Sequence, residues 1–456
     1  MDRLRHLAEI FDAALARVDP RNMLESHVAL DGDDLLVAFE SEHHRVNLAN
    51  FDRIFAIGVG KAAARMAQAI EKILGERLSG GVIVTKYGHG EKLDRLSVIE
   101  AGHPIPDDNS VRGAKAIMDL TQGADERTLF INLVSGGGSA LACAPYFGPE
   151  TALSLDDKQA TTSVLLACGA EIGEINCLRK HLSMIKGGRL LNLMAPARSL
   201  NFILSDVVGD DLNTIASGMT HPDKTTFSQV LSILDKYNIR NKIPVPALEI
   251  FTLGAEGRIA ETPKPGIAAA GLARNIMIGT NLAACLAAKE KGRALGYNVA
   301  VLTSSLTGEA REAAKFMYGI AIDARKNDLF LEKPALVIVG GETTVTVCGT
   351  GKGGRNQEMA LAFLSNLAKD ELKGQDISFL SASTDGSDGP TDAAGAFAGK
   401  SVLAAADAAG LSIADYLTHN DSYHFFDKID FLLKTGPTMT NVGDLHMAII
   451  APATDS

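Results

Sequence analysis

The sequence has no apolar run of the roughly 18–20 residues that a membrane-spanning helix requires. Its first twenty residues space their apolar side chains like one face of a helix. Glu9 and Asp12 interrupt this segment, so it lacks the apolar stretch of a signal peptide. We therefore expect a cytoplasmic protein that does not associate with membranes.

An excess of positive charge is also absent. The 456 residues include 44 Lys and Arg against 55 Asp and Glu, a formal net charge of −11. Nucleic acids and anionic membranes are bound by clustered basic side chains, so we expect neither as a partner. An anionic ligand must then bind at a local basic site within an acidic molecule.

Several motifs of well-known sites are missing. The five cysteines are odd in number and form no CxxC pair, which indicates reduced thiols rather than disulfides or a zinc site. The sequence contains no G-x-x-x-x-G-K-[ST] phosphate loop, no H-E-x-x-H and no G-x-S-x-G. Of the eleven histidines, only His103 and His181 have polar or basic neighbours typical of a ligand site. We expect both to be turn or core residues whose ring nitrogens are hydrogen-bonded within the protein.

What the chain does contain is apolar segments that alternate with helical periods from about residue 50 onward, as in "RIFAIGVG" followed by "KAAARMAQAIEKIL". This alternation predicts two α/β domains, the first Rossmann-like, with a mostly parallel sheet between layers of helices. Prolines gather around residues 243–271, which predicts a boundary between domains at 1–250 and 265–456. In the second, smaller domain, adjacent strand segments leave no room for a helix, which indicates a mixed sheet.

Glycine-rich segments follow the predicted strands, where open α/β sheets bind ligands. The segment "AIGVGKAAA" contains Gly58, Gly60 and Lys61 and matches the G-x-G-x-x-A dinucleotide pattern. The next strand ends in Thr85-Lys86 rather than in the acid that NAD requires, although a Lys suits NADP. A phosphate loop and a simple tight turn both remain open here.

The segment "LVSGGGSALACAP" places three consecutive glycines at a strand–helix junction. Because glycine runs lose much conformational entropy on folding, such a run usually serves a close backbone approach. We expect an anion-binding loop made of Ser135, Gly136, Gly137, Gly138 and Ser139, with a packing turn as the alternative.

A basic segment, "LRKHLSMIKGGRL", stands out in the acidic chain and contains Arg179, Lys180, Lys186 and Arg189. A solvated basic face would explain it without any ligand. Its paired glycines would, however, let Arg189 turn toward a ligand, so we predict that Lys180 and Arg189 bind substrate or nucleotide.

Carboxylates follow the strand segment "NFILSD". Mg²⁺ takes one or two carboxylates and leaves its other positions to water and phosphate oxygens. Asp206 and Asp210 are therefore candidate Mg²⁺ ligands, with turn or helix-capping roles as the alternative.

A second G-x-G-x-x-G pattern, residues 349–354, precedes Arg355. A guanidinium stands where a pyrophosphate would lie, and the preceding strand belongs to a hairpin, so we interpret the match as coincidental. We expect a flexible loop that presents Arg355 as a charge clamp. Other residues at strand ends of this half that we predict to line the site are Glu342, Thr343, Asn356 and Asp385.

Together these segments resemble one family, the glycerate 2-kinases with an N-terminal DUF4147 domain and a C-terminal MOFRL domain, whose members are often labelled hydroxypyruvate reductase. The matching segments cover nearly the whole chain, and Met219 is a departure, since members typically have Pro there. In order they are "GVGKAA", "GHPIPD", "SGGGSAL", "KHLSMIKGGRL", "SDVVGDDLNTIASG", "GGETTVTV", "GKGGRNQE", "STDGSDGPTDAAG" and "NVGDLHMAII".

The resemblance implies ATP- and Mg²⁺-dependent phosphorylation of D-glycerate to 2-phosphoglycerate, in a cleft between the two domains. It implies that Lys61 and Arg355 are the active-site lysine and arginine, and that the Gly136–Gly138 loop and Asp206 face the same cleft. Either Asp206 or Asp210 would hold Mg²⁺ or accept the hydroxyl proton. We expect only small molecules as partners, D-glycerate and ATP, with a homodimer as the one assembly considered.

Two other functions stay open from the sequence. One is an NAD(P)H-dependent hydroxypyruvate reductase, and the other is a non-catalytic phosphosugar-binding regulator. The sequence also leaves open the position of phosphorylation, the stereochemistry of the acid, the preferred metal and the oligomeric state.

Overall fold

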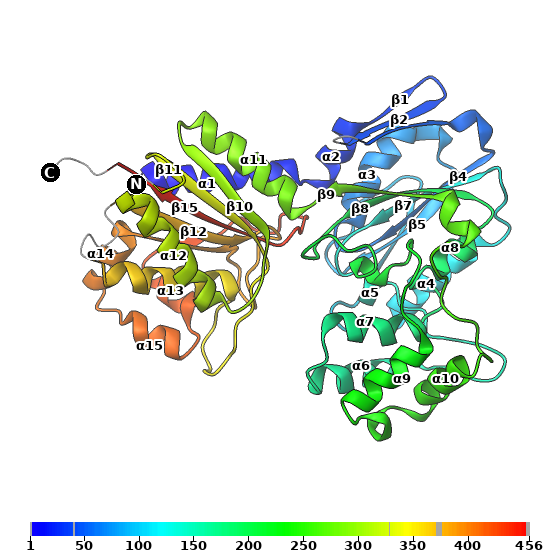
Figure 1. Ribbon diagram of the computed structural model, residues 1–456. Helices are drawn as coiled ribbons and strands as arrows, with labels where there is room; N and C mark the ends of the chain where they lie inside the picture. The colour runs from blue at the N-terminus through cyan, green and yellow to red at the C-terminus, as the bar shows by residue number, and fades with distance from the viewer. Residues whose placement is uncertain (1, 40–41, 328, 371–375, 453–456) are drawn as a thin grey trace. The chain divides into compact units, whose positions relative to one another are not determined.

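The computed structural model describes residues 2–39, 42–327, 329–370 and 376–452. It divides into two compact units, one of Pro20–Ile278 and the other of Met1–Asp19 together with Gly279–Ser456. The chain therefore passes from one unit to the other twice. Both units are α/β structures, as the sequence predicts (Figure 1).

The first helix, α1 (Asp2–Arg17), belongs to the unit built mainly from the C-terminal half. This differs from the predicted boundaries, which assigned residues 1–250 to a single domain. Helix α1 packs against α11 (Asn281–Ala294), and its apolar stripe is fully buried. Periodicity predicts such a stripe but cannot say which unit buries it. The stripe consists of Leu7, Ile10, Phe11 and Ala14.

The Pro20–Ile278 unit is built on a six-stranded sheet with the order β6-β5-β4-β7-β8-β9. The chain starts at β4, adds β5 and β6 on one side and then β7 and β8 on the other, with parallel pairing among these five strands. This is the doubly wound Rossmann order, whose ligand-binding point is the reversal between β4 and β7. The strands are β4 (Arg53–Val59), β5 (Gly80–Lys86), β6 (Ser97–Ala101), β7 (Thr128–Val134), β8 (Arg198–Leu204) and β9 (Ala273–Gly279).

Helices flank this sheet, and a separate group of helices, α6, α7, α9 and α10, lies together in the same unit (Figure 1). A small antiparallel sheet completes the unit, formed by β1 (Val28–Asp31), β2 (Asp34–Phe39) and β3 (Glu42–Asn47). The helices are α2 (Pro20–His27), α3 (Ala63–Leu74), α4 (Asp108–Thr121), α5 (Gly138–Leu141), α6 (Leu155–Ala167), α7 (Ile172–His181), α8 (Arg189–Met194), α9 (Phe227–Lys236) and α10 (Val245–Ala255).

The other unit has a mixed sheet with the order β10-β11-β15-β12-β13-β14, which confirms the prediction. Strand β15 runs antiparallel to both of its neighbours, β11 and β12. In this register Asp444, the first residue of β15, is paired with Gly341 and with Ser383, the last residues of those neighbours. The strands are β10 (Asn298–Leu306), β11 (Ala335–Gly341), β12 (Ile377–Ser383), β13 (Gly395–Gly399), β14 (Leu432–Leu433) and β15 (Asp444–Ile450).

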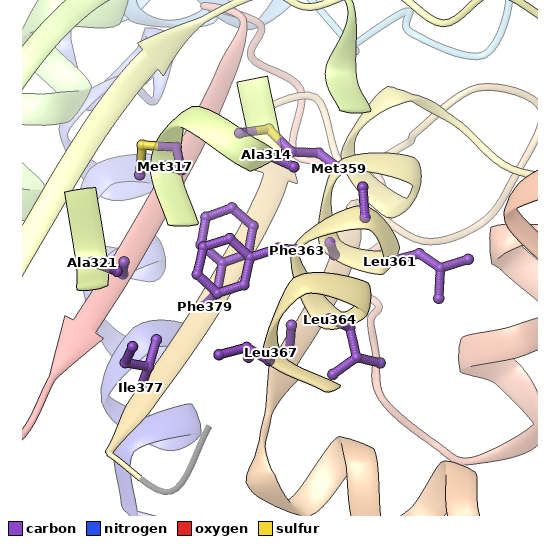
Figure 2. Packing of buried hydrophobic residues seen from close by; sticks show 14 of the residues in the cluster. Ala314, Met317, Ala321, Met359, Leu361, Phe363, Leu364, Leu367, Ile377 and Phe379 are labelled. Atoms are coloured by element: carbon purple, nitrogen blue, oxygen red, sulfur yellow. The ribbon is translucent and has the colours of Figure 1, made fainter. Parts of the chain in front are cut away.

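The core of this unit fixes α13 (Arg355–Ala368) against the sheet. Phe363 of α13 and Phe379 of β12 stack face to face, with ring centroids 4.1 Å apart, and Met317 of α12 lies beside them (Figure 2). Because α13 is buried along most of its length, its first residue, Arg355, has a defined position. The other helices here are α12 (Ala310–Asn327), α14 (Lys400–Ala408), α15 (Ile413–Thr418) and α16 (Ser422–Lys428).

None of the helices in the described residues combines the length and the apolar character that a membrane span needs.

Candidate active site

The parallel strands of the Pro20–Ile278 unit bring polar residues to one edge of the sheet. Because parallel strands end on the same side, side chains that follow them meet there. These residues are Lys61 after β4, Lys86 at the end of β5, His103 after β6, the Gly136–Gly138 loop after β7 and Asp206 after β8.

The triple-glycine loop is packed directly by three of these side chains. A Cβ atom on Gly136 would collide with the carboxylate of Asp206. One on Gly137 would lie 2.9 Å from the His103 ring and 3.3 Å from Cγ of Lys61. Gly137 also has a φ of 80°, in the left-handed region. The structure therefore brings Lys61, the loop and Asp206 together, and only glycine fits between them.

In the loop after β4, the backbone N–H groups that a pyrophosphate would need donate hydrogen bonds within the protein. The Lys61 N–H donates to the Gly136 carbonyl (2.9 Å), and the Ala62 N–H donates to Ser135 Oγ (3.0 Å). Gly60 is required by the same close approach, since a Cβ there would collide with Ser135. Gly58 is crowded by the Ile83 side chain. These two glycines thus have packing roles in the structure.

The loop after β7 differs from the loop after β4 in its backbone hydrogen bonds. Within the described residues, the backbone N–H groups of Gly136, Gly137 and Ser139 donate to no acceptor. The Ser139 hydroxyl lies 2.8 Å from the Ser217 hydroxyl, so it is already engaged. An anion at this edge would therefore be bound by the second glycine loop and by Lys61, rather than by the first glycine loop.

His103 is part of this site, although the sequence gives it only a turn or core role. Burial, together with the charges of Lys61, Lys86 and His89, lowers the pKa of His103 to about 4. The imidazole is therefore neutral at neutral pH and offers a hydrogen bond without adding charge. Its place directly after a strand, in "GHPIPD", is the signal that could have identified it.

The two basic residues predicted to bind ligand have partners within the protein. Lys180 forms a buried ion pair with Asp223, with Nζ and Oδ1 3.0 Å apart. The Arg189 guanidinium donates to the Ala260 carbonyl (3.4 Å). His181 is a satisfied core histidine, as expected, since its Nδ1 lies 2.7 Å from the Cys177 carbonyl oxygen.

The predicted metal ligands differ in their surroundings. Asp206 lies against the glycine loop, whereas Asp210 is half-buried and its pKa is raised by that burial. In the described part of the chain, no group of three or more His, Cys, Asp and Glu side chains could hold a metal ion by itself. Mg²⁺ needs fewer protein ligands when phosphate oxygens complete its shell, so the carboxylate of Asp206 beside a glycine loop is compatible with this ion.

In the other unit, Arg355 is held by two carboxylates. Its Nε and Nη2 bind Asp444 at 2.5 and 2.9 Å, and Nη1 lies 2.8 Å from Oε1 of Glu342. Burial alone would lower the pKa of Arg355, but the two carboxylates raise it above its usual range. Asp444 is fully buried and was not predicted as a site residue, because an Asp that opens an apolar strand has no distinctive sequence pattern.

The helix that follows the second G-x-G-x-x-G pattern is capped by the protein's own carboxylate. Asp388 accepts hydrogen bonds from the N–H groups of Asn356 (3.1 Å) and Gln357 (2.8 Å). A Cβ on Gly354 would collide with this carboxylate. The place of a dinucleotide pyrophosphate is thus taken by Asp388, which supports the interpretation of the pattern as coincidental.

The glycines of this loop were expected to give flexibility, but they serve close packing. Cβ atoms on Gly349, Gly351 and Gly353 would collide with residues of the segment 419–422. The loop that precedes Arg355 is therefore a packed structure and not a flexible one.

The remaining predicted residues of this unit lie around the same strand ends. Asn356 is buried and accepts a hydrogen bond from Ser381 Oγ (2.7 Å). Thr343 is buried, and its hydroxyl has no hydrogen-bond partner within the described residues. Asp385 accepts from the Ser387 N–H (2.9 Å) and closes a turn.

Comparison with known proteins identifies the family. Residues 6–252 match the family described as "Domain of unknown function (DUF4147)", and residues 335–444 match the MOFRL family. A D-glycerate 2-kinase from Thermotoga maritima is 42% identical over 405 residues, which span 88% of this chain and 91% of that protein. The chain belongs to the glycerate 2-kinase family. The resemblance predicted from the nine sequence segments is thereby confirmed.

Other members of the glycerate 2-kinase family match over similar lengths. A glycerate 2-kinase from Pyrococcus horikoshii is 38% identical over 96% of this chain and 95% of its own. A protein from Agrobacterium vitis named as a putative hydroxypyruvate reductase is also 38% identical, over 97% of this chain and 94% of its own. The crystal structure of a glycerate kinase from Thermotoga maritima superposes with a TM-score of 0.85 at 38% identity, covering 99% of this chain and 100% of that one.

Proposed function

We propose that this protein transfers the γ-phosphoryl group of ATP to the 2-hydroxyl of D-glycerate, giving 2-phosphoglycerate and ADP. The observation that carries this proposal is the meeting of Lys61, the Gly136–Gly138 loop and Asp206 at one edge of the Rossmann-like sheet. The family relatives named as glycerate 2-kinases support the same activity.

Phosphoryl transfer requires positioning and neutralisation of a spreading negative charge rather than covalent help. The uncommitted N–H groups of Gly136, Gly137 and Ser139 would bind phosphate oxygens, and the Lys61 ammonium beside them would add a full positive charge. The neutral imidazole of His103 would donate or accept one further hydrogen bond in the same place.

Arg355 is the proposed second cation. Asp444 binds two of its nitrogens and so fixes the plane of the guanidinium before any ligand arrives. Glu342 is partly exposed and lies 2.8 Å from Nη1, so a phosphate oxygen would compete with Glu342 for that nitrogen. We propose that Arg355, like Lys61, takes part in phosphoryl transfer by neutralising negative charge.

Asp206 is the proposed Mg²⁺ ligand, with Asp210 as the second candidate. When bound, the ion would neutralise charge on the nucleotide phosphates. The alternative role for Asp206 is to accept the proton of the glycerate hydroxyl. If Asp206→Asn kept full turnover at saturating Mg²⁺, both roles would be withdrawn from this residue.

A reductase finds little support in the geometry. The first N–H groups of the β4 loop are hydrogen-bonded within the protein, and β5 ends in Lys86 rather than in a ribose-binding acid. When the protein is mixed with NADH and hydroxypyruvate, the absorbance of NADH should therefore stay unchanged.

The decisive experiment is an ADP-release assay with D-glycerate, followed by phosphorus NMR of the product. Phosphate on the secondary 2-oxygen couples to one carbon-bound proton and gives a doublet, whereas phosphate on the primary 3-oxygen couples to two and gives a triplet. L-glycerate is the stereochemical control. ATP binding without ADP release on any short hydroxy acid would favour a regulator instead. We also propose a cytoplasmic location, which cell fractionation would test.

A further inference from the structure

Three basic side chains next to the triple-glycine loop have no role in the proposed mechanism so far. They are Lys158 of α6, Arg179 of α7 and Lys186, and we call them the basic cluster. Lys158 and Lys186 are only 4% and 1% exposed, whereas Arg179 is half-buried and can be reached from solvent.

Hydrogen bonds tie the cluster to the chain around the loop. Nζ of Lys158 donates to the Leu182 carbonyl (3.2 Å), and Nζ of Lys186 donates to the Ser139 carbonyl (2.5 Å). Ser139 is the last residue of the loop that we propose for phosphate binding. An isolated bridge between Pro145 and Ser183 holds the two chain segments together.

Among the residues that the structure describes, the cluster has no carboxylate partner. Burial, with repulsion among the three groups, lowers the pKa of Lys186 well below its usual value, and burial is also the main cause of the lowered pKa values of Lys158 and Arg179. In the described part of the chain, the group that opposes these shifts is the thiol of Cys143, which is hydrogen-bonded to Lys158, and no carboxylate does so. Arg179 makes no hydrogen bond or ion pair there.

Lys180 directly follows Arg179 in α7 but differs from the basic cluster in having a charged partner. Lys180 is equally buried, but it is paired with Asp223 at 3.0 Å. Buried charges are normally paired in this way, because an unpaired charge loses its hydration without compensation. Three basic side chains that have no carboxylate partner in the described residues are therefore the composition of an anion site, because a bound anion would supply the missing counter-charge.

We propose that the basic cluster binds the carboxylate of the acceptor acid, with the Arg179 guanidinium as the direct ligand and the two buried lysines behind it. This inference rests on the proposed function and names the group that would recognise its substrate. A guanidinium fork matches a planar carboxylate with two parallel hydrogen bonds. The nucleotide phosphates already have donors in the glycine loop and Lys61, and the buried lysines favour a small anion over a triphosphate.

The test is Arg179→Gln, studied by steady-state kinetics and by calorimetric titration with D-glycerate. We expect the KM and Kd for D-glycerate to rise about 10- to 100-fold, the loss typical of a hydrogen bond to a charged group. The KM for ATP should stay within about twofold. Glycerol, which has the same hydroxyls but no carboxylate, should be used as poorly by the variant as by the wild type.

The matched control is Arg198→Gln, which makes the same chemical change at the exposed beginning of β8, the opposite edge of the sheet. It should leave both KM values within about twofold. Arg179→Lys should restore part of the affinity for D-glycerate, since it keeps the charge but loses the fork.

Thermal unfolding separates ligand binding from a structural role. Without ligand, Arg179→Gln should unfold at the same temperature as the wild type or higher, because it removes an unpaired charge. The rise in Tm that D-glycerate causes should be lost. An unchanged affinity for D-glycerate, or a weakened affinity for ATP alone, would overturn the inference. A wild type that binds D-glycerate but releases no ADP would refute the kinase activity and leave the carboxylate site standing.

Discussion

The guanidinium of Arg355 and the carboxylate of Asp444 form a bidentate ion pair, with Nε–Oδ2 and Nη2–Oδ1 distances of 2.5 and 2.9 Å. Asp444 opens the central strand β15 and is paired in register with Gly341 and Ser383. The sheet thus fixes the carboxylate, and the carboxylate fixes the direction of the guanidinium.

The first prediction concerns this pair. Asp444→Asn should lower kcat about 100-fold, because the amide cannot accept both guanidinium hydrogen bonds and Arg355 loses its orientation. The KM for D-glycerate should change much less. The variant should also unfold at a lower temperature, because breaking a buried pair from one side leaves the other charge uncompensated. Steady-state kinetics and thermal unfolding provide both measurements.

The control for Asp444→Asn is Asp52→Asn. Asp52 forms the same bidentate geometry with Arg127, at 2.5 Å for both contacts, but both side chains are more than half exposed. Exposed pairs contribute about 0–1 kcal/mol, so this variant should keep its kcat and nearly its Tm. Equal effects of the two substitutions would show that Asp444 has no special relation to the reaction.

The second prediction concerns Lys61 and Arg355 as a pair. Lys61→Met should lower kcat about 10²- to 10³-fold, and Arg355→Lys should lower it to a similar degree. If both cations act on one phosphoryl group, the double variant should lose less than the product of the single losses, because residues that work as a unit are not additive. Strictly multiplicative losses would separate their roles. Lys72→Met, at an exposed position of α3, is the control.

The third prediction isolates the shape of the triple-glycine loop. Gly137 and Gly169 have φ values of 80° and 75°, so Ala is strained by about 1 kcal/mol at either position. At Gly137 the new methyl would also lie 2.9 Å from the His103 ring, whereas at Gly169 nothing lies within 4 Å. Gly137→Ala should therefore abolish ADP release, and Gly169→Ala should keep it at a slightly lower Tm. Comparable activity in the two variants would argue against the loop as a phosphate site.

Much of the fold was predictable because each of its central strands can be recognised from its own sequence. Segments such as "RIFAIGVG" and "TLFINLV" are buried on both faces, so they read as continuous apolar runs, and the polar residues that follow them mark the edge of the sheet. The glycine loop and Asp206 could be chosen on that basis alone, whereas Lys61 was chosen from the resemblance to the family.

Residues that depend on pairing over long sequence distances could not be predicted. Asp444 meets Arg355 from 89 positions away, and Asp388 caps its helix from more than 30. The pairing within the basic segment also depends on distant residues. The sequence does not show that Lys180 is paired with Asp223, or that its neighbour Arg179 has no carboxylate partner in the described residues. The binding role predicted for Lys180 stays a prediction.

The last prediction concerns pH. Burial raises the pKa of Asp388 from 3.8 to about 7, against the opposing N–H donors of Gln357 and Asn356. The folded protein therefore holds this proton more tightly than the unfolded chain. The resulting stabilisation is complete below pH 4 or so and is lost as the pH rises toward 7, with a slope of up to about 1.4 kcal/mol per pH unit.

Asp388→Asn removes this titration while keeping one acceptor oxygen for the helix. The Tm of the variant should therefore rise relative to that of the wild type between pH 5 and pH 8, as thermal unfolding at matched ionic strength would measure. A Tm difference that stays constant over this range would mean that Asp388 is already ionised at pH 5. In that case the two N–H donors and the nearby charge of Arg355 would outweigh burial in setting the pKa of this carboxyl.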